Sequence, residues 1–149
     1  MPRKYDMWTH GTSVQVQEKG WEARAVREGY STKVTPGNDL LFGWVHFAIP
    51  TPVMIDSAPL KAQVALIRFN IGSQASIEHF QVFNGEGKII DRGVKYPRKR
   101  MGRAQSEEEP IQDQPVLIGG VGISIKVVFT GRDRDAWIEL IGAGIQFFS

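Results

Sequence analysis

The sequence predicts an all-β protein, a two-layer antiparallel β-sandwich or jelly roll of about eight strands. Apolar residues recur at every second position along most of the chain, whereas helical periodicity is almost absent. An aromatic, β-prone run over residues 44–53 ends at two prolines that frame a threonine. Short connections rich in glycine, asparagine and aspartate separate the apolar runs, as in sandwiches.

The N-terminal half contains three expected strand regions. Residues 12–18 alternate Val14 and Val16 with polar residues, which is typical of a strand with one face in water. Residues 23–35 predict a weak strand and a turn. Residues 44–49 form a strand that leaves the sheet at the prolines, because proline lacks the N–H that a ladder needs.

The middle of the chain predicts a strand and a hairpin. Residues 62–71 place apolar side chains on one face and polar ones partly on the other. Residues 77–83 and 88–90 flank Asn84-Gly85, a step that accepts positive φ and suits a tight reversal. We therefore expect these two segments to pair.

The C-terminal third carries a short internal similarity. Residues 120–125 resemble residues 142–147, each with glycines two positions apart, so that a neighbouring chain or an aromatic ring can approach one face closely. Residues 123–129 alternate, a turn follows at 131–135, and residues 137–140 are apolar again. The two strands are expected to pair as an antiparallel hairpin.

Length and composition limit the classes of protein. The 149 residues fit a single domain, residues 1–149, with one core. The absence of cysteine excludes a disulfide scaffold, thiolate catalysis and Cys-ligated metal sites. The charged first residues resemble no signal peptide, and no run approaches the ~18 apolar residues of a membrane span. We expect a cytoplasmic protein without membrane contact; removal of a leader would leave secretion open.

One long charged loop is expected at about residues 92–115. Its first half is basic and its second half acidic, although the net charge of the chain is only +2. Three interpretations compete: a solvated connection, a polyanion-binding loop, and an assembly element in which opposite halves of neighbouring copies pair. The charged residues concerned are Arg92, Lys95, Arg98, Lys99, Arg100, Arg103, Glu107, Glu108 and Glu109.

No catalytic residues, metal ligands or cofactors are predicted. The sequence has three histidines, His10, His46 and His79, too far apart for a local zinc motif. Because strands bring distant residues together, a metal-dependent site of His10 and His46 with Asp56 or Glu78 remains the least favoured hypothesis. Histidines bonded to backbone are the commoner outcome.

Tryptophan offers an argument for binding. Among four tryptophans, Trp21 lies at a turn beside Gly20 and is the one expected to be exposed, where a flat ring can stack on a sugar. Trp44 and Trp137 lie in apolar strands and are expected in the core or an interface. A lectin-like carbohydrate site would use Trp21, His10 and His46.

Several segments together resemble a family of small bacterial proteins of unknown function. They are Met7-Trp8-Thr9-His10-Gly11, residues 46–53 with the sequence His-Phe-Ala-Ile-Pro-Thr-Pro-Val, and Val82-Phe83-Asn84-Gly85. The resemblance covers most of the chain and implies a β-sandwich. It implies no activity and no catalytic residue, and the charged loop departs from the family pattern.

The leading hypothesis is a non-catalytic β-sandwich that binds a partner or assembles with copies of itself. The last strand is apolar on both faces and must be covered by its own core or by another subunit. A homo-oligomer is the simplest cover, and its expected interface residues are Ile141, Ile145, Phe147 and Phe148. The alternative is the lectin-like domain, with a carbohydrate as partner.

Overall fold

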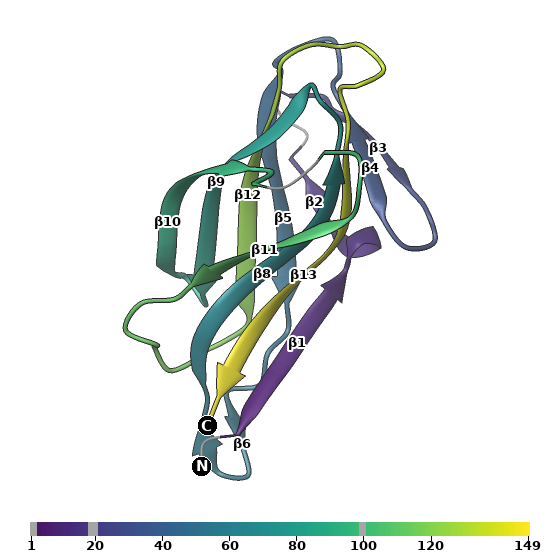
Figure 1. Cartoon of the computed structure of the whole chain (residues 1–149). Coiled ribbons are helices and arrows are strands. Elements are labelled where there is room, and N and C mark those ends of the chain that lie inside the picture. The colour runs from purple at the N-terminus through teal and green to yellow at the C-terminus, as the bar shows by residue number, and fades with distance from the viewer. Residues whose placement is uncertain (1–2, 18–20, 99–100) are drawn as a thin grey trace.

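The computed structural model describes residues 3–17, 21–98 and 101–149 and shows a two-layer antiparallel β-sandwich (Figure 1). The chain order of its first elements is β1 Lys4–His10, a 3₁₀ turn η1 Gly11–Ser13, β2 Gln15–Val16, β3 Arg24–Arg27, β4 Thr32–Thr35, β5 Phe42–Ile49, β6 Met54–Ile55 and β7 Ala58–Pro59. The remaining strands are β8 Lys61–Ile71, β9 Ala75–Asn84, β10 Gly87–Tyr96, β11 Gln105–Pro110, β12 Val121–Phe129 and β13 Ile138–Phe148.

Two main sheets make up the layers. Sheet A has the order β11-β8-β13-β4-β3, and β1 pairs with the second half of β13 along the edge that β4 occupies in the first half. Sheet B has the order β10-β9-β12-β5-β2. β6 and β7 form a separate two-stranded ribbon. Most spatial neighbours are therefore distant in sequence.

The core lies between the sheets because apolar residues alternate along the long strands. On β5, Val45, Phe47 and Ile49 point inward and are buried. On β12, which pairs with β5, Ile123 and Ile125 are also buried. The intervening residues of both strands point to the outside of sheet B, so the period-two pattern that predicted strands also defines an outer face.

Several sequence predictions are confirmed. The strand expected over residues 44–49 is β5, and the one over 62–71 is β8. β9 and β10 form the predicted hairpin, closed at Asn84↔Gly87 with Gly85 at φ 59°. The fold class, an antiparallel sandwich, is thereby established.

The hairpin expected between residues 123–129 and 137–140 is wrong. β12 lies in sheet B between β9 and β5, and β13 lies in sheet A between β8 and the β1 and β4 strands. Alternation of apolar and polar residues shows that each strand has an inward face. The same alternation is expected whether two strands pair in one sheet or face each other across the core, so it does not predict which strands pair. The strand expected at 12–18 is shorter than predicted, because η1 covers Thr12 and Ser13 and β2 spans only Gln15–Val16.

The long loop expected at 92–115 is wrong as well. β10 continues to Tyr96, and β11 spans Gln105–Pro110 as the edge strand beside β8. Inward and outward positions alternate along β11, and two of the inward positions are occupied by Glu107 and Glu109. Glutamates at such positions are typical of a solvated segment, so the sequence did not predict a strand here. The strand forms because arginines elsewhere in the chain pair with these carboxylates.

The described residues contain no helix long and apolar enough to cross a membrane.

Candidate functional site

The outer face of sheet B gathers aromatic and polar side chains from four neighbouring strands. The register aligns Asp91 of β10, Gln81 of β9, Ser124 of β12 and His46 of β5 in one row across the sheet. The adjacent row contains His79 of β9, Lys126 of β12 and Trp44 of β5. We call this surface, defined by the residues of these two rows with Phe42 and Phe83 at its ends, the sheet B face.

Hydrogen bonds order the polar half of the sheet B face. The Asp91 carboxylate bonds to the His79 ring, accepts a bond from Gln81 Nε2 at 3.3 Å and pairs with Lys88 Nζ at 3.2 Å. Toward β5, His46 Nδ1 lies 2.7 Å from Ser124 Oγ. These side chains are held by one another, and all but the buried Ser124 remain partly open to water, as required of groups that exchange hydrogen bonds with a polar ligand.

Aromatic rings border this network. The Trp44 and His79 rings meet edge to face with their centroids 5.7 Å apart. Lys126, between them in strand order, places Nζ 4.8 Å from the Phe42 ring centroid. Phe42 is 44% exposed. Flat apolar rings next to fixed polar groups are the combination that binds amphipathic rings, because such ligands have both apolar faces and hydroxyl edges.

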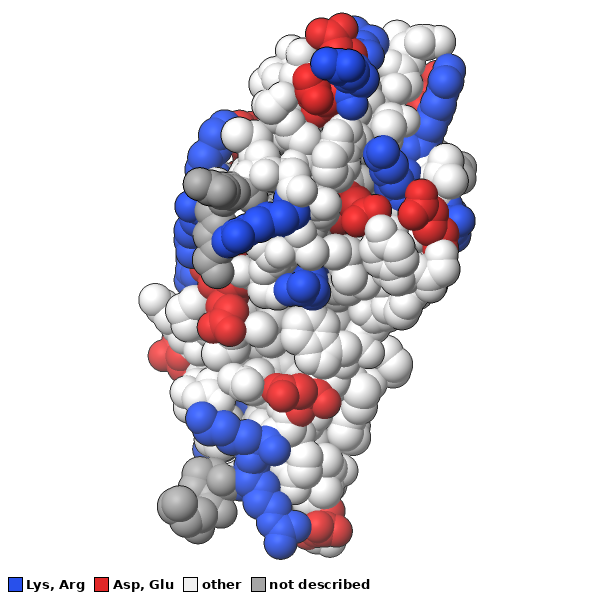
Figure 2. All heavy atoms as spheres, turned by 45° about the vertical axis from the view of Figure 1, so that its right-hand side comes forward, with Lys and Arg blue, Asp and Glu red and all other residues white. Residues whose placement is uncertain are grey.

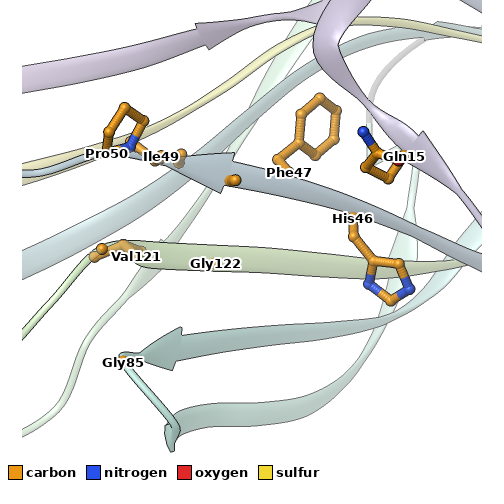
Figure 3. Close-up of a pocket in the computed structure, with 10 residues that line it drawn as sticks. Gln15, His46, Phe47, Ile49, Pro50, Gly85, Val121 and Gly122 are labelled. Atoms are coloured by element: carbon orange, nitrogen blue, oxygen red, sulfur yellow. The ribbon is translucent and has the colours of Figure 1, made fainter.

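An open depression of about 510 Å³ lies at one end of the sheet B face. Gln15, His46 and Ala48 line one side, and the glycines Gly85 and Gly122 are also part of its lining. Figure 3 shows His46 projecting from β5 on the side opposite to Phe47, which points into the core. Since glycines leave backbone uncovered here, a ligand can lie close to the strands.

Burial among its neighbours lowers the pKa of His46 below its usual 6.5. The imidazole is therefore neutral at physiological pH, and the bond to Ser124 uses a ring nitrogen as either donor or acceptor. A neutral ring is suited to hydrogen-bonding a hydroxyl group.

We predict that Asp91 stays ionised to unusually low pH. The hydrogen bonds from His79, Lys88 and Gln81 lower the pKa of Asp91 from 3.8 to about 2. Because the pKa of the folded state is depressed, the network favours folding above about pH 4 and loses this contribution as the pH falls toward 2. A carbon-detected NMR titration of the Asp91 carboxyl measures this pKa. The variant His79→Ala is expected to move the titration midpoint toward 3.8. A wild-type midpoint near 3.8 would contradict the network.

The exposed position predicted for Trp21 is wrong. Trp21 is only 1% exposed and stacks on Phe129 with ring centroids 6.2 Å apart. Its ring covers Gly43 of β5, where a Cβ would lie 2.1 Å from Trp21 Cδ2. The missing side chain of Gly43 makes room for the indole in the core, so Trp21 has no surface to offer a ligand.

The structure separates the two histidines proposed as a metal pair. His10 ends β1 in sheet A, whereas His46 lies on the outside of sheet B, so the combined site is not formed. Glu78 pairs instead with Lys95 at 2.6 Å. Within residues 3–17, 21–98 and 101–149, no three His, Asp or Glu side chains could hold a metal ion.

The charged residues of 92–115 mostly pair within the chain. Glu109 bonds to Arg92 and lies 3.2 Å from Arg98, and Glu107 lies 3.5 Å from Arg98. Arg103 and Glu108 are exposed, and Lys99 and Arg100 lie outside the described residues. Figure 2 shows basic and acidic side chains interspersed over the visible face. These pairs tie part of the expected loop to the edge of the sandwich, while polyanion binding and assembly through its charged residues stay predictions.

Two of the four predicted interface residues belong to the core. Ile145 is fully buried and Phe147 is 1% exposed, because β13 is flanked by β8 and β1 and covered by sheet B. Ile141 and Phe148 are half-buried, and a role for them in assembly stays a prediction. The chain's own core is thus the cover that the terminal strand requires.

Sequence reasoning missed most of the sheet B face. Of its residues only His46 was named as a ligand contact, while Trp44 was assigned to a core or interface. The signal was present in the alternation of His79, Gln81 and Phe83 on β9 and of Ser124 and Lys126 on β12. Only the strand order β9-β12-β5 shows that these outward-facing residues form one surface.

The fold is a two-layer antiparallel β-sandwich that is also found in carbohydrate-binding modules. A low-affinity xylan-binding module, CBM86, from Roseburia intestinalis superposes with a TM-score of 0.56 at 10% identity, covering 96% of each chain. A family 35 carbohydrate-binding module from Clostridium thermocellum gives 0.54 at 12% identity, covering 95% of this chain and 97% of that one. A chain of a glycosylation-associated protein complex (Gap123) from Streptococcus agalactiae gives a TM-score of 0.54 at 9% identity. The match covers 96% of this chain but only 25% of that chain.

The chain belongs to a family of unknown function, DUF6623, which matches residues 1–149. This confirms the resemblance to an uncharacterised family. No curated protein matches the sequence. The structural relatives, at these identities, show the shared fold.

Proposed function

We propose that this protein is a non-catalytic carbohydrate-binding module and that the sheet B face contacts the sugar. The observation that carries the proposal is the hydrogen-bonded cluster of Asp91, His79 and Gln81, which lies beside the partly exposed ring of Trp44. The fold shared with a xylan-binding module supports the class of ligand.

The chemistry of the face fits a neutral saccharide. A pyranose ring offers an apolar C–H face for Trp44 or Phe42 and hydroxyl groups for the polar row. The carboxylate of Asp91 accepts from hydroxyls, while Gln81 and neutral His46 both accept and donate. The face continues into the depression beside Gly122, which extends the contact for a chain of several sugars.

Trp44→Ala is expected to weaken binding of neutral oligosaccharides about tenfold, because one stacking platform is lost. The test is a titration of labelled protein with xylohexaose and cellohexaose, following backbone amide shifts by NMR. Tyr30→Ala serves as the matched control, since Tyr30 is an aromatic residue 55% exposed between β3 and β4 and belongs to neither binding surface. Saturable shifts of residues on the sheet B face that are reduced in Trp44→Ala support the proposal. Absence of shifts with both sugars, or unchanged affinity in Trp44→Ala, would overturn it.

A homo-oligomer remains a separate prediction. Its original argument, the doubly apolar last strand, is weakened because Ile145 and Phe147 are buried in the chain's own core. Light scattering after size exclusion measures the mass in solution and therefore the number of copies in the particle.

A further inference from the structure

We propose a second binding site, on the outer face of sheet A, that takes a sugar ring carrying a carboxylate. It is built from Trp8 and His10 of β1 and Arg68 of β8, with Gly142 and the half-buried Ile141 of β13 between them. These residues and Thr9 line a depression of about 330 Å³. The site shares no residue with the sheet B face, so the inference stands independently of the proposed function.

The strand register creates a slot across the sheet. Arg68 pairs with Gly142, and Gly142 pairs with His10, so that the three residues lie in one row. Neighbouring strands are about 4.8 Å apart, which separates the Arg68 and His10 backbones by roughly 10 Å. Gly142 places no side chain between them. The depression over Gly142, about 330 Å³ in volume, is the space that a six-membered ring would occupy.

Trp8 forms a wall of this slot. Its indole lies against the glycine strand of β13: a Cβ on Gly144 would be 2.6 Å from Trp8 Cδ2, and one on Gly142 would be 3.7 Å from Trp8 Cε3. The glycines therefore let the ring pack closely on the backbone. Trp8 is nevertheless 46% exposed, so much of the ring remains open to a ligand. An aromatic ring is one of the groups that the glycine repeat was expected to admit, but the sequence did not identify which ring.

Arg68 supplies the charge. Arg68 Nη1 donates a hydrogen bond to the Ser106 hydroxyl at 3.2 Å, and no ion pair joins Arg68 to a carboxylate in the described part of the chain. By contrast, Arg92 and Arg98 are held by buried glutamates. A guanidinium binds a carboxylate with two parallel hydrogen bonds, which makes Arg68 the group that selects an acidic ligand.

His10 is oriented by its own turn. The Thr12 backbone N–H donates to His10 Nδ1 at 3.2 Å, and the Thr12 hydroxyl lies 2.8 Å from the same nitrogen. Since Nδ1 accepts, the neutral ring carries its proton on Nε2, which is left as a hydrogen-bond donor. A ring between Arg68 and His10 thus meets a cation on one side and a donor on the other, beside an aromatic wall.

The test compares D-glucuronic acid with D-glucose, which differ only in the carboxylate, at equal concentration and ionic strength. Amide and indole NMR shifts of labelled full-length protein report binding. We expect saturable shifts of Trp8, Arg68 and Gly142 with glucuronic acid and at least about tenfold weaker binding of glucose. Sodium acetate controls for simple anion binding, and equal shifts with acetate would overturn the proposal.

Variants assign the roles within the slot. Arg68→Gln is expected to reduce binding of glucuronic acid to the level of glucose; Arg68 is exposed, so the fold is retained. Trp8→Ala is expected to weaken binding of both sugars at the slot, and Tyr30→Ala, at an aromatic residue outside both sites, is expected to weaken neither. If Arg68→Gln keeps the preference for glucuronic acid, or if Trp44→Ala removes the binding, the second site is wrong. Failure of xylohexaose to bind would count against the sheet B face alone.

Discussion

Trp21→Ala is expected to destabilise the protein by about 3–5 kcal/mol, the usual cost of truncating a large buried aromatic side chain. The indole is 1% exposed, stacks on Phe129 and occupies the space above Gly43. Alanine would leave a cavity between β5 and the start of the turn after β12, because backbone strands on both sides cannot collapse into it. Thermal unfolding followed by circular dichroism should show a fall of roughly 10 °C.

Two further variants control this prediction. Trp21→Phe fills much of the same volume and removes an indole N–H that has no hydrogen-bond partner among the described residues, so its cost should be clearly smaller. Val26→Ala, at a site 60% exposed, should change stability by less than about 0.5 kcal/mol. Equal stability of Trp21→Ala and Val26→Ala would show that Trp21 is not part of the core.

The error over Trp21 shows what local sequence can and cannot predict. The turn expected at Trp21 is present: Trp21 lies in a turn, and the next residue, Glu22, has a positive φ of 52°. The direction of the side chain depends on Gly43, which lies far along the chain in a strand otherwise filled by aromatic residues. A glycine inside such a strand indicates close approach of another group, and it was the available signal.

The sheet B face was predictable in its parts and not in its assembly. Alternation on β5 already places Trp44 and His46 on the side opposite to Val45 and Phe47. The partner strand β12 follows more than seventy residues later in the chain, as the register Ser124↔His46 shows. Because each sheet is assembled from strands that are not consecutive, local patterns do not specify which outward-facing rows become neighbours.

The charge pattern of residues 105–109 predicts a solvated loop for a related reason. Gln105, Glu107 and Glu109 recur at every second position and are all buried, so β11 has the period of a strand with polar residues in the apolar places. Burial of a carboxylate is tolerated only with partners, and those partners belong to β10 and to the segment that follows it. A loop was therefore predicted where an edge strand and an internal charge cluster exist.

Glu109→Ala should destabilise the protein by about 3 kcal/mol, because truncating one member of a buried, hydrogen-bonded charge cluster leaves the others without their acceptor. The Glu109 side chain is 3% exposed; it accepts from the Tyr96 hydroxyl, from Arg92 and, at 3.2 Å, from Arg98 Nη2. Tyr96 belongs to sheet B and Glu109 to sheet A, so this cluster joins the edges of the two layers.

Burial and the hydrogen bond to Glu109 raise the pKa of Tyr96, which keeps the phenol protonated as the donor through the alkaline range. Glu108→Ala is the matched control: Glu108 lies next to Glu109 on the same strand, carries the same charge and is exposed, so its removal should cost less than about 0.5 kcal/mol. Urea unfolding of both variants measures the difference. Similar midpoints would mean that the cluster adds nothing to stability. A large loss confined to Glu109→Ala, together with an earlier alkaline titration of Tyr96 by absorbance, would show that this carboxylate holds the sheet edges together.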